Sequence, residues 1–477
     1  MVERTPTLLG GKWISEGPGL ERVGPFVRTV VSSARVAEPG DARAAAEFAK
    51  AGSRTVARLA PATRAAVLDR ASVLATERRA AIARLLALEL GKPLRDGLGE
   101  LDRVADTFAV CAAAARDIGG DVLPVAGWAR GAGNTAMTYR APAGVALAIT
   151  PFNAPANLLA HKLGASFAAG NSTIVKAPPQ APAASAAVVS LLLDAGAPVE
   201  AVQLLHGGGE VGAELCAAPE VAVISFTGSA ETGAAVARAA GAKRLVLELG
   251  GNAATIVCDD ADLGRAAKVC ARTGYSNSGQ SCISVQRIYV ARAQKDRFVQ
   301  RLAGEVAKLQ VGDPLDPSTD VGSMVDEAAA ERVQGWATKS GGKIALGGNR
   351  DGATLSPTVV VDPREDAEVV VKEVFGALVV VLPFDDFDAV LQTCNRSSFG
   401  LQAGLFTNDA GRIFTAWREL EVGGLIVNGS SNYRLDHVPF GGVKDSGFGR
   451  EDPRHMVEDY TVVKTLILRG LSIWGEN

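Results

Sequence analysis

Cysteine and histidine are scarce in this chain, and the cysteines are not arranged in pairs. Six cysteines and four histidines occur among 477 residues. There is no Cys-x-x-Cys pair and no Cys/His cluster, so the sequence predicts neither a disulfide framework nor a zinc site. Scattered cysteines of this kind are typical of reduced thiols, and we therefore expect a cytoplasmic protein.

The sequence also lacks a long apolar run and any block of a single charge sign. No uninterrupted apolar stretch approaches the roughly 20 residues of a membrane span, and the opening residues, MVERTPTLLGGKW, are charged and interrupted by Pro and Gly. The 49 basic and 52 acidic residues are well mixed and leave a net charge of −3. We expect no membrane segment, no export and no nucleic-acid partner.

The pattern of apolar residues predicts two α/β units. A chain of this length is too long for one ordinary core. Residues 41–90 carry apolar residues at helical spacing up to the stop signal Gly91-Lys92-Pro93, which predicts a helical pair. From about residue 143, short Val/Ile runs alternate with Ala-rich helical stretches, and a second such series begins near residue 253. This alternation favours parallel, doubly wound sheets.

Two further segments alternate like strands but stand outside both series. They are NTAMTYRAP, residues 134–142, and DYTVVKTLILRG, residues 459–470. We interpret them as a small flap that joins subunits, and so expect a homo-oligomer.

Two residues in glycine-containing segments are candidates for covalent and acid–base chemistry. Cys282 lies in SNSGQSCISVQ, residues 276–286, but a lone cysteine is more often an inert buried thiol than a nucleophile. Glu248 ends a strand in ELGGN, where only Leu249 separates it from two glycines. Ligands of open α/β sheets usually bind at this edge, so Glu248 is a candidate general base, and the alternative is a solvated strand end.

Asn153 is a candidate donor to a developing negative charge. The segment ITPFNAP holds it in a rigid loop between Pro151 and Pro155. An amide fixed in this way is suited to stabilise an oxyanion. The alternative is that Asn153 only closes a turn, as asparagine often does.

Two more strand ends are candidates for holding a nucleotide. Lys176 ends a strand in IVKAP, where it would bind ribose hydroxyls or simply face solvent. The segment SFTGSAETG, residues 225–233, leads through Gly228-Ser229 into a helix whose free N–H groups would bind a phosphate. An ordinary helix cap is the alternative for this second segment.

Taken together and in this order, the motifs resemble the aldehyde dehydrogenase superfamily. EVFG (373–376) and PFGGVKDSGFGRE (439–451) add to the likeness, which spans nearly the whole chain. The resemblance implies an α/β fold in three parts. They are a Rossmann-type NAD(P)-binding domain (1–122 and 143–249), a second α/β domain that is catalytic (250–455), and a small β oligomerisation flap (123–142 and 456–477).

The resemblance also implies a reaction. The Cys282 thiolate would attack an aldehyde, and the Asn153 side chain and the Cys282 N–H would hold the oxyanion. After hydride transfer to the nicotinamide, a water deprotonated by Glu248 would hydrolyse the thioester. Two alternatives stay open: a relative that passes the acyl group to coenzyme A, and a catalytically silent structural or binding homologue. The presence of Glu248 argues against the first, and the three intact residues argue against the second.

Cofactor contacts are implied by the same resemblance. The residues expected to make them are Thr150, Pro151, Lys176, Pro179, Gly228, Ser229, Glu373 and Phe375. Relatives that prefer NAD commonly carry a glutamate three positions after the lysine, where this chain has Pro179. Without that carboxylate a 2′-phosphate is not repelled, so NADP or dual use of NADP and NAD is expected.

Substrate contacts are expected from Phe152, Ser281 and Ile283 at the tunnel entrance. Arg434, in SSNYRLDHVPFGG, would anchor the charged end of a small hydroxylated or anionic aldehyde through paired hydrogen bonds. The alternative is that Arg434 pairs with the nearby Asp436 on the surface.

Overall fold

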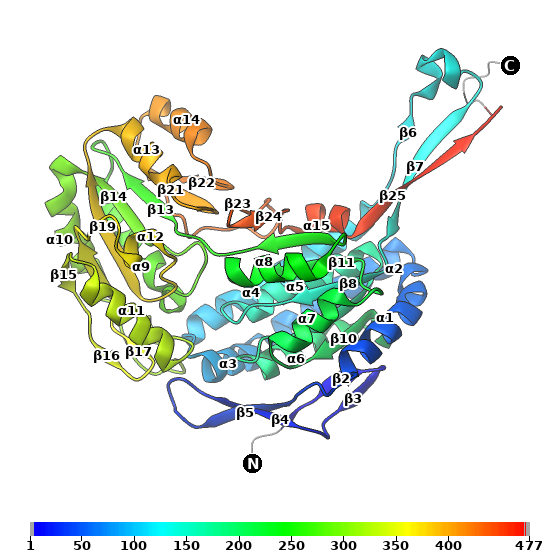
Figure 1. Ribbon diagram of the computed structural model, residues 1–477, viewed down its shortest axis with the longest axis horizontal. Helices are drawn as coiled ribbons and strands as arrows, with labels where there is room; N and C mark the ends of the chain where they lie inside the picture. The colour runs from blue at the N-terminus through cyan, green and yellow to red at the C-terminus, as the bar shows by residue number, and fades with distance from the viewer. Residues whose placement is uncertain (1–3, 472, 474–477) are drawn as a thin grey trace.

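The computed structural model describes residues 4–471 and 473, which form two α/β units and a projecting β arm (Figure 1). The first unit contains an eight-stranded sheet of order β24-β12-β11-β8-β9-β10-β2-β3. Its parallel centre consists of β8 (Val145–Ile149), β9 (Ser172–Lys176), β10 (Val202–Leu205), β11 (Val223–Thr227) and β12 (Arg244–Glu248). All residues of β8 to β11 are buried. Burial on both faces explains why these strands read as continuous apolar runs.

Antiparallel strands close both edges of this sheet. They are β2 (Thr7–Leu9) and β3 (Lys12–Ile14) at one edge and β24 (Gly447–Phe448) at the other. A separate small sheet near the N-terminus consists of β1 (Arg4–Thr5), β5 (Val30–Arg35) and β4 (Gly19–Val23).

The expected helical pair over residues 41–90 is three helices. They are α1 (Asp41–Ala57), α2 (Pro61–Glu77) and α3 (Arg79–Leu90). Pro61 opens α2, because proline fits the first turn of a helix, and Gly91 ends α3 in the left-handed conformation (φ 71°), as the sequence predicted. The other helices of the unit are α4 (Leu94–Arg116), α5 (Pro155–Ala169), α6 (Pro182–Asp194), α7 (Gly209–Ala217) and α8 (Ala230–Ala240), with a 3₁₀ turn, η3 (Val199–Ala201).

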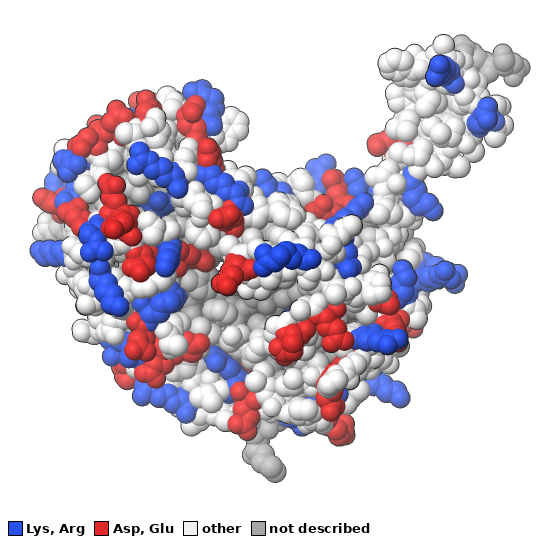
Figure 2. All heavy atoms as spheres, viewed as in Figure 1, with Lys and Arg blue, Asp and Glu red and all other residues white. Residues whose placement is uncertain are grey.

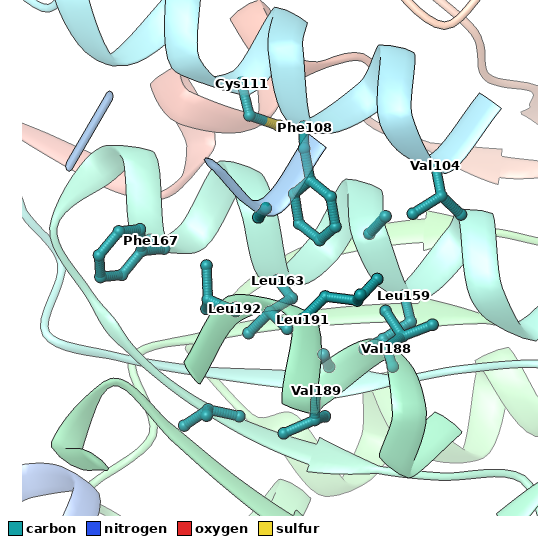
Figure 3. Close-up of a cluster of buried hydrophobic side chains, with 14 of the residues drawn as sticks. Val104, Phe108, Cys111, Leu159, Leu163, Phe167, Val188, Val189, Leu191 and Leu192 are labelled. Atoms are coloured by element: carbon teal, nitrogen blue, oxygen red, sulfur yellow. The ribbon is translucent and has the colours of Figure 1, made fainter. Parts of the chain in front are cut away.

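Helix α5 is the centre of the first unit, and every one of its residues is buried. Figure 3 shows Leu159 and Leu163 of α5 lying between Phe108 of α4 and the leucines of α6. The helix therefore has no polar face, and the few polar side chains that it carries have no access to bulk water.

The second unit contains a seven-stranded sheet of order β15-β18-β19-β14-β13-β21-β22. Its parallel strands are β13 (Ala254–Val257), β14 (Arg287–Ala291), β18 (Thr358–Val361), β19 (Leu378–Phe384), β21 (Gln402–Phe406) and β22 (Gly424–Val427). An antiparallel strand, β15 (Lys343–Leu346), lies at one edge. Its α-helices are α9 (Leu263–Tyr275), α10 (Lys295–Val306), α11 (Glu327–Lys339), α12 (Glu368–Val371), α13 (Phe387–Asn395) and α14 (Ala410–Glu419). The α/β class with two parallel sheets is confirmed.

Short elements connect these parts. They are the turns η4 (Ser276–Gly279) and η5 (Arg292–Gln294) and the strand pairs β16 (Arg350–Asp351) with β17 (Thr354–Leu355) and β20 (Phe399–Gly400) with β23 (Val443–Lys444). After β24 the chain forms α15 (Pro453–Asp459), which packs on α5 and α4. The motif PFGGVKDSGFGRE thus carries the chain back from the second unit to the first.

The strands outside both series pair with each other, as their pattern suggested. β25 (Thr461–Leu468) runs antiparallel to β7 (Thr135–Pro142), which also pairs with β6 (Val122–Leu123), and the turns η1 (Val125–Gly127) and η2 (Ala129–Gly131) join β6 to β7. The arm projects from the body in Figure 1 and has few charges in Figure 2, where the two units carry interleaved blue and red residues. Trp128 and Ile467 on this arm are exposed. Residues 472 and 474–477 of the expected flap, and residues 1–3 of the expected first domain, lie outside the described residues.

Within residues 4–471 and 473, no helix combines the length and the apolar character needed to cross a bilayer.

Candidate active site

Four parallel strands of the first sheet end at one edge, and each end carries or precedes a residue singled out in the sequence. β8 ends at Ile149, paired with Lys176 at the end of β9, and β11 ends at Thr227, paired with Glu248 at the end of β12. Carboxyl ends of parallel strands are the usual ligand-binding edge of an open α/β sheet. The expected general base therefore lies beside the turn expected to hold a phosphate.

The loop with Cys282 connects α9 to β14 and begins in an unusual conformation. Asn277 and Ser278 have φ of 50° and 56°, and Gly279 has φ of 72°. Only glycine fits at position 279, because a Cβ there would lie 2.1 Å from the carbonyl oxygen of Gly376. The nucleophile loop is thereby pressed against the EVFG loop.

Cys282 differs from the other cysteines in its exposure. It is half-buried, whereas the other five are buried. Its side chain packs against the cluster of Ile283, Leu401 and Phe440, so the expected contact residue Ile283 lies at the nucleophile. The Oγ of Ser281, another expected contact residue, accepts the Ile283 N–H at 3.4 Å.

The pKa of the Cys282 thiol is raised to about 12 in this environment. Desolvation is the largest cause, the carboxyl groups of Glu373 and Glu248 add to it, and the guanidinium of Arg434 opposes it. The resting thiol is therefore protonated at neutral pH, and reaction requires that its proton leave as sulfur attacks.

Asn153 is held directly against the nucleophile loop. Its Nδ2 donates to the carbonyl oxygen of Gln280 at 3.1 Å. In return, the Nδ2 of Asn277 donates to the carbonyl oxygen of Asn153 at 3.0 Å. Two residues singled out 129 positions apart in the sequence, Asn153 and Cys282, are thus brought to one place.

Glu248 lies under the nucleophile and is almost completely buried, with 2% exposure. A Cβ at Gly251 would lie 2.2 Å from the carbonyl oxygen of Cys282, so the Glu-Leu-Gly-Gly turn touches the nucleophile loop. A Cβ at Gly441 would lie 2.8 Å from Oε1 of Glu248, so the Pro-Phe-Gly-Gly motif leaves space for the carboxyl group. Neither oxygen of Glu248 has a hydrogen-bond partner in the described part of the chain.

Burial raises the pKa of Glu248 well above its usual range, and the negative charge of Glu451 raises it further. Arg434, Lys162 and Arg450 oppose this shift. Glu248 therefore favours its uncharged form more than an exposed glutamate does. It becomes a base when a proton acceptor, a nearby cation or a reacting water favours its charged form.

A buried cluster of charges lies beside Glu248. Nζ of Lys162, from α5, is 2.8 Å from Glu451, and Arg434 is 3.0 Å from the other oxygen of Glu451. Burial alone would raise the pKa of Glu451, but Lys162 and Arg434 hold it at about 2. Sequence reasoning missed Lys162 and Glu451. The available signal was a lysine in the otherwise almost wholly apolar helix ANLLAHKLGASFAA.

Arg434 is an interior residue, not part of a surface pair. Its side chain is 7% exposed, lies over the ring of Phe440 at 4.2 Å, and is 3.7 Å from Asp436. The expected surface alternative is therefore wrong, because Asp436 is buried too. Asp436 accepts two hydrogen bonds from Arg103, at 2.9 and 2.6 Å, and lies 2.9 Å from Nε2 of His161.

The groups expected to hold a dinucleotide have unused bonding capacity. Lys176 is 8% exposed and has no ion pair within the described residues. Burial lowers its pKa to about 8, against a smaller opposing effect of Glu210. The hydroxyl groups of Thr150 and Thr227 are buried without hydrogen-bond partners. A ligand with hydroxyl and phosphate groups would satisfy such atoms.

The turn after β11 also suits a phosphate group. A Cβ at Gly228 would lie 2.5 Å from the ring of Phe226, so only glycine fits there. Ser229 caps α8 by accepting the Thr232 N–H at 3.2 Å. The helix cap is therefore present, and phosphate binding stays a prediction that the cap does not contradict, since a capped helix still presents free N–H groups at its first turn. Pro151 and Pro179 are half-buried at the same edge.

The EVFG loop places the last two expected cofactor residues beside the nucleophile. Oε1 of Glu373 accepts the Gly251 N–H at 2.9 Å, and burial raises the pKa of Glu373 to about 7. The ring of Phe375 meets the ring of Phe152 edge-on, with centroids 5.8 Å apart. The chemistry of the residues at this edge therefore fits a nicotinamide dinucleotide.

Comparison with known proteins agrees with this geometry. The family model described as "Aldehyde dehydrogenase family" matches residues 13–466. The chain belongs to the aldehyde dehydrogenase family. It is 40% identical to 3-sulfolactaldehyde dehydrogenase from Priestia aryabhattai over 98% of each chain. This resemblance to a curated relative covers both units and the projecting arm.

Solved structures show the same fold at full length. Aldehyde dehydrogenase 21 from Physcomitrella patens, in complex with the reaction product succinate, has a TM-score of 0.96 and 32% identity, with 99% of this chain and 100% of that chain covered. Glyceraldehyde-3-phosphate dehydrogenase GapN from Methanocaldococcus jannaschii, complexed with NADP, has a TM-score of 0.91 and 32% identity, with 94% and 99% covered. The chain is an NAD(P)-dependent aldehyde dehydrogenase.

The contact between Gly441 and Glu248 gives a test of the site geometry. We expect Gly441→Ala to lower kcat by up to about 100-fold, because a Cβ there would lie 2.6 Å from the carbonyl oxygen of Gly449 and 2.8 Å from Oε1 of Glu248, so the loop and the carboxyl group must shift. Gly99→Ala is the matched control, since a Cβ at Gly99 has nothing within 4 Å. Steady-state rates and melting temperatures of both variants measure the effect. Equal rates for the two variants would contradict the placement of Glu248 against Gly441.

Proposed function

We propose that this aldehyde dehydrogenase forms a covalent bond between Cys282 and its aldehyde and releases the free acid. The observation that carries the proposal is that the loops of Asn153 and Glu248 both contact the loop of Cys282. These loops come from three different parts of the chain. The hydrogen bond from Asn153 to Gln280 and the close backbone approach at Gly251, where a side chain would not fit, hold them together. This is the arrangement that acyl chemistry on a thiol requires.

In the first step, the sulfur of Cys282 adds to the aldehyde carbon, and the thiol proton passes to solvent water, which reaches the half-buried side chain. The carbonyl oxygen takes the negative charge, and the second N–H of the Asn153 amide and the backbone N–H of Cys282 donate to it. Each such donor stabilises the transition state by about 2.7–4 kcal/mol. The half-buried position of Cys282 excludes most water, which strengthens both hydrogen bonds.

In the second step, the thiohemiacetal loses a hydride and becomes a thioester. A nicotinamide cofactor held by Lys176, Ser229 and Glu373 supplies the hydride acceptor when bound. Glu248 then takes a proton from water, the hydroxide adds to the thioester carbon, and the carbon–sulfur bond breaks to give the acid and the Cys282 thiol. The unbonded oxygens of Glu248 are free to accept this water.

The two alternatives are less well supported. A relative that passes its acyl group to coenzyme A has no need of a base at Glu248, yet this chain places a carboxyl group beside the nucleophile. A silent homologue has no need of the matched set of Asn153, Cys282 and Glu248 in contact.

NADP, or both NADP and NAD, is the cofactor that we propose. Lys176 is buried without an ion pair among the described residues, and Pro179 offers no carboxylate to oppose a 2′-phosphate. The solved relative from Methanocaldococcus jannaschii is complexed with NADP. Comparison of kcat/KM for the two cofactors measures the preference.

For the substrate we propose a small hydroxylated or anionic aldehyde. Beside Glu248, the cluster holds the buried Lys162 and Arg434 and the partly exposed Arg103 against two carboxylates, Asp436 and Glu451. Each cation pairs with a carboxylate, and the five groups together carry one more positive than negative charge. Nε of Arg434 has no hydrogen bond in the described part of the chain but lies 3.7 Å from Oδ1 of Asp436, so Arg434 would act on an anionic substrate mainly through its charge. The relative from Priestia aryabhattai is named for an aldehyde that carries a sulfonate.

We further propose the division into domains at residues 122/143 and 249/250, with 123–142 and 456–477 as the oligomerisation flap. The exposed apolar residues of the projecting arm support the flap, because such patches usually mark contacts between chains. A homodimer or homotetramer follows. A cytoplasmic location is supported by six free cysteines.

Cys282→Ala tests the nucleophile. We expect dehydrogenase activity to vanish, because alanine cannot bond to the aldehyde, while NADP binding stays within about threefold of wild type. The buried Cys270, replaced by alanine, is the control for loss of a thiol as such. Absorbance of reduced cofactor measures the activity. Retained activity in Cys282→Ala would exclude the covalent mechanism.

Glu248→Gln separates the two chemical steps. We expect a burst of reduced cofactor equal to the enzyme concentration, followed by a steady rate lowered about 100-fold or more, because the amide cannot deprotonate water. Stopped-flow absorbance resolves both phases. If the burst is also lost, then Glu248 acts before hydride transfer, as the acceptor of the Cys282 proton.

Arg434→Gln tests the charge of the substrate and the pH dependence together. We compare kcat/KM for an anionic aldehyde with kcat/KM for a neutral aldehyde of equal length. In the variant we expect this ratio to fall about 10- to 100-fold, which corresponds to the free energy of one hydrogen bond to a charged group. Removal of this cation also raises the pKa of both Cys282 and Glu248, so the activity of the variant appears at higher pH with either substrate. Arg434→Lys is the control that keeps the charge. An unchanged ratio between the two aldehydes would remove Arg434 from substrate recognition.

A further inference from the structure

The carbonyl oxygen of Gln280 is a shared acceptor between the nucleophile loop and the oxyanion-binding amide. The Nδ2 atoms of Asn153 and Asn277 both donate to it, each at 3.1 Å. Asn277 donates with the same Nδ2 to the carbonyl oxygen of Asn153 at 3.0 Å. The two amide side chains and two carbonyl groups thus form one small network two residues before Cys282.

The orientation of the Asn277 amide follows from this network. Its Nδ2 faces two carbonyl oxygens, and the reversed orientation would place Oδ1 against two acceptors. One of the two N–H groups of the Asn153 side-chain amide donates to Gln280. Because the amide group is planar, this bond also fixes the direction of the second N–H group. Rotation of the Asn153 side chain would break its bond to Gln280 and move this second N–H away from the sulfur.

The backbone of Asn277 is held as firmly as its side chain. Its N–H donates to Asp96, at the start of α4, at 2.7 Å. Its carbonyl oxygen accepts the N–H of Gln280 at 3.0 Å. The left-handed conformation of Asn277 (φ 50°, ψ 36°) is one that asparagine tolerates better than most residues. Asn277 therefore joins α4, the Asn153 loop and the Cys282 loop.

We propose that Asn277 is a positioning residue, which fixes the Asn153 amide relative to Cys282 so that its free N–H meets the developing oxyanion. The proposal rests on the proposed roles of Asn153 and Cys282. It adds to them a residue that touches neither the aldehyde nor the sulfur and acts only through Asn153.

A double-mutant cycle of Asn153 and Asn277 tests this. Asn277→Gly keeps the left-handed backbone and removes the side chain, so strain is not introduced. The variants are Asn153→Ala, Asn277→Gly and both together, with Ser278→Gly as the matched control, because it has the same conformation but no bond to Asn153. The rate constant of the reduced-cofactor burst, with lactaldehyde and NADP, is the readout. NADP affinity within about threefold of wild type confirms that each variant is folded.

We expect Asn153→Ala to slow the burst about 100-fold and Asn277→Gly about 10-fold or more. The double variant should be no more than about twofold slower than Asn153→Ala, since both changes remove the same interaction. Ser278→Gly should stay within about threefold of wild type. Asn277→Asp, which has the same shape but presents oxygen to both carbonyl groups, should not restore the rate.

Alkylation of Cys282 by iodoacetamide separates positioning of the amide from an effect on the thiol, because this reaction forms no oxyanion. We expect the alkylation rate and its pH profile in Asn277→Gly to match wild type within about threefold. The proposal would be overturned if the burst of the double variant slowed by the product of the two single effects. It would also be overturned if alkylation of Asn277→Gly slowed as much as its burst. If Asn153→Ala itself reacts as fast as wild type, the proposed oxyanion role of Asn153 fails, which is a different outcome.

Discussion

In the interior beside the nucleophile, Lys162 and Arg434 share the carboxylate of Glu451, at 2.8 and 3.0 Å, and all three side chains are almost fully buried. Buried charges are costly unless they are paired, and loss of one partner leaves the others uncompensated. This triad joins α5 of the first unit to the loop that returns from the second. The position of the C-terminal motif, and with it the space left for Glu248 beside Gly441, depends on it.

The same charges bear on the proton transfers that we propose. Burial raises the pKa of both Cys282 and Glu248, nearby carboxyl groups raise each further, and Arg434 opposes both shifts. The cluster of Arg103, Lys162, Arg434, Asp436 and Glu451 carries one more positive than negative charge. This surplus favours a single additional anion, either the Cys282 thiolate or the Glu248 carboxylate. In the mechanism that we propose, the thiolate would be needed when the aldehyde is attacked, and the carboxylate of Glu248 only after sulfur has bonded to carbon and carries no charge. Separation of the two anions in time avoids the cost of holding both.

The sequence predicted those features of the structure that depend on residues close together in the chain. The buried strands, the stop at Gly91 and the α/β alternation follow from local patterns, and the structure confirms them. Helix α5 lacks a polar face and so gives no amphipathic periodicity, and α4 was not expected at all. The burial of Arg434 and Asp436 was also missed, because their partners Glu451, His161 and Arg103 lie on other elements. The partners of Asp436 are up to 333 positions away, and no local spacing encodes such a pairing.

Close approach of backbones explains how the catalytic groups keep their geometry. A Cβ at Gly251 would meet the Cys282 carbonyl, one at Gly279 would meet the Gly376 carbonyl, and one at Gly441 would meet Glu248. At these glycines the four loops approach each other more closely than any residue with a side chain would permit. One loop can therefore move relative to the others only if several of these contacts break at the same time. Distances between backbones vary less than side-chain rotamers, and a reaction sensitive to an ångström benefits from this. The left-handed residues before Cys282 are consistent with this view: the close packing of the loops compensates for a conformation that an isolated loop would rarely adopt.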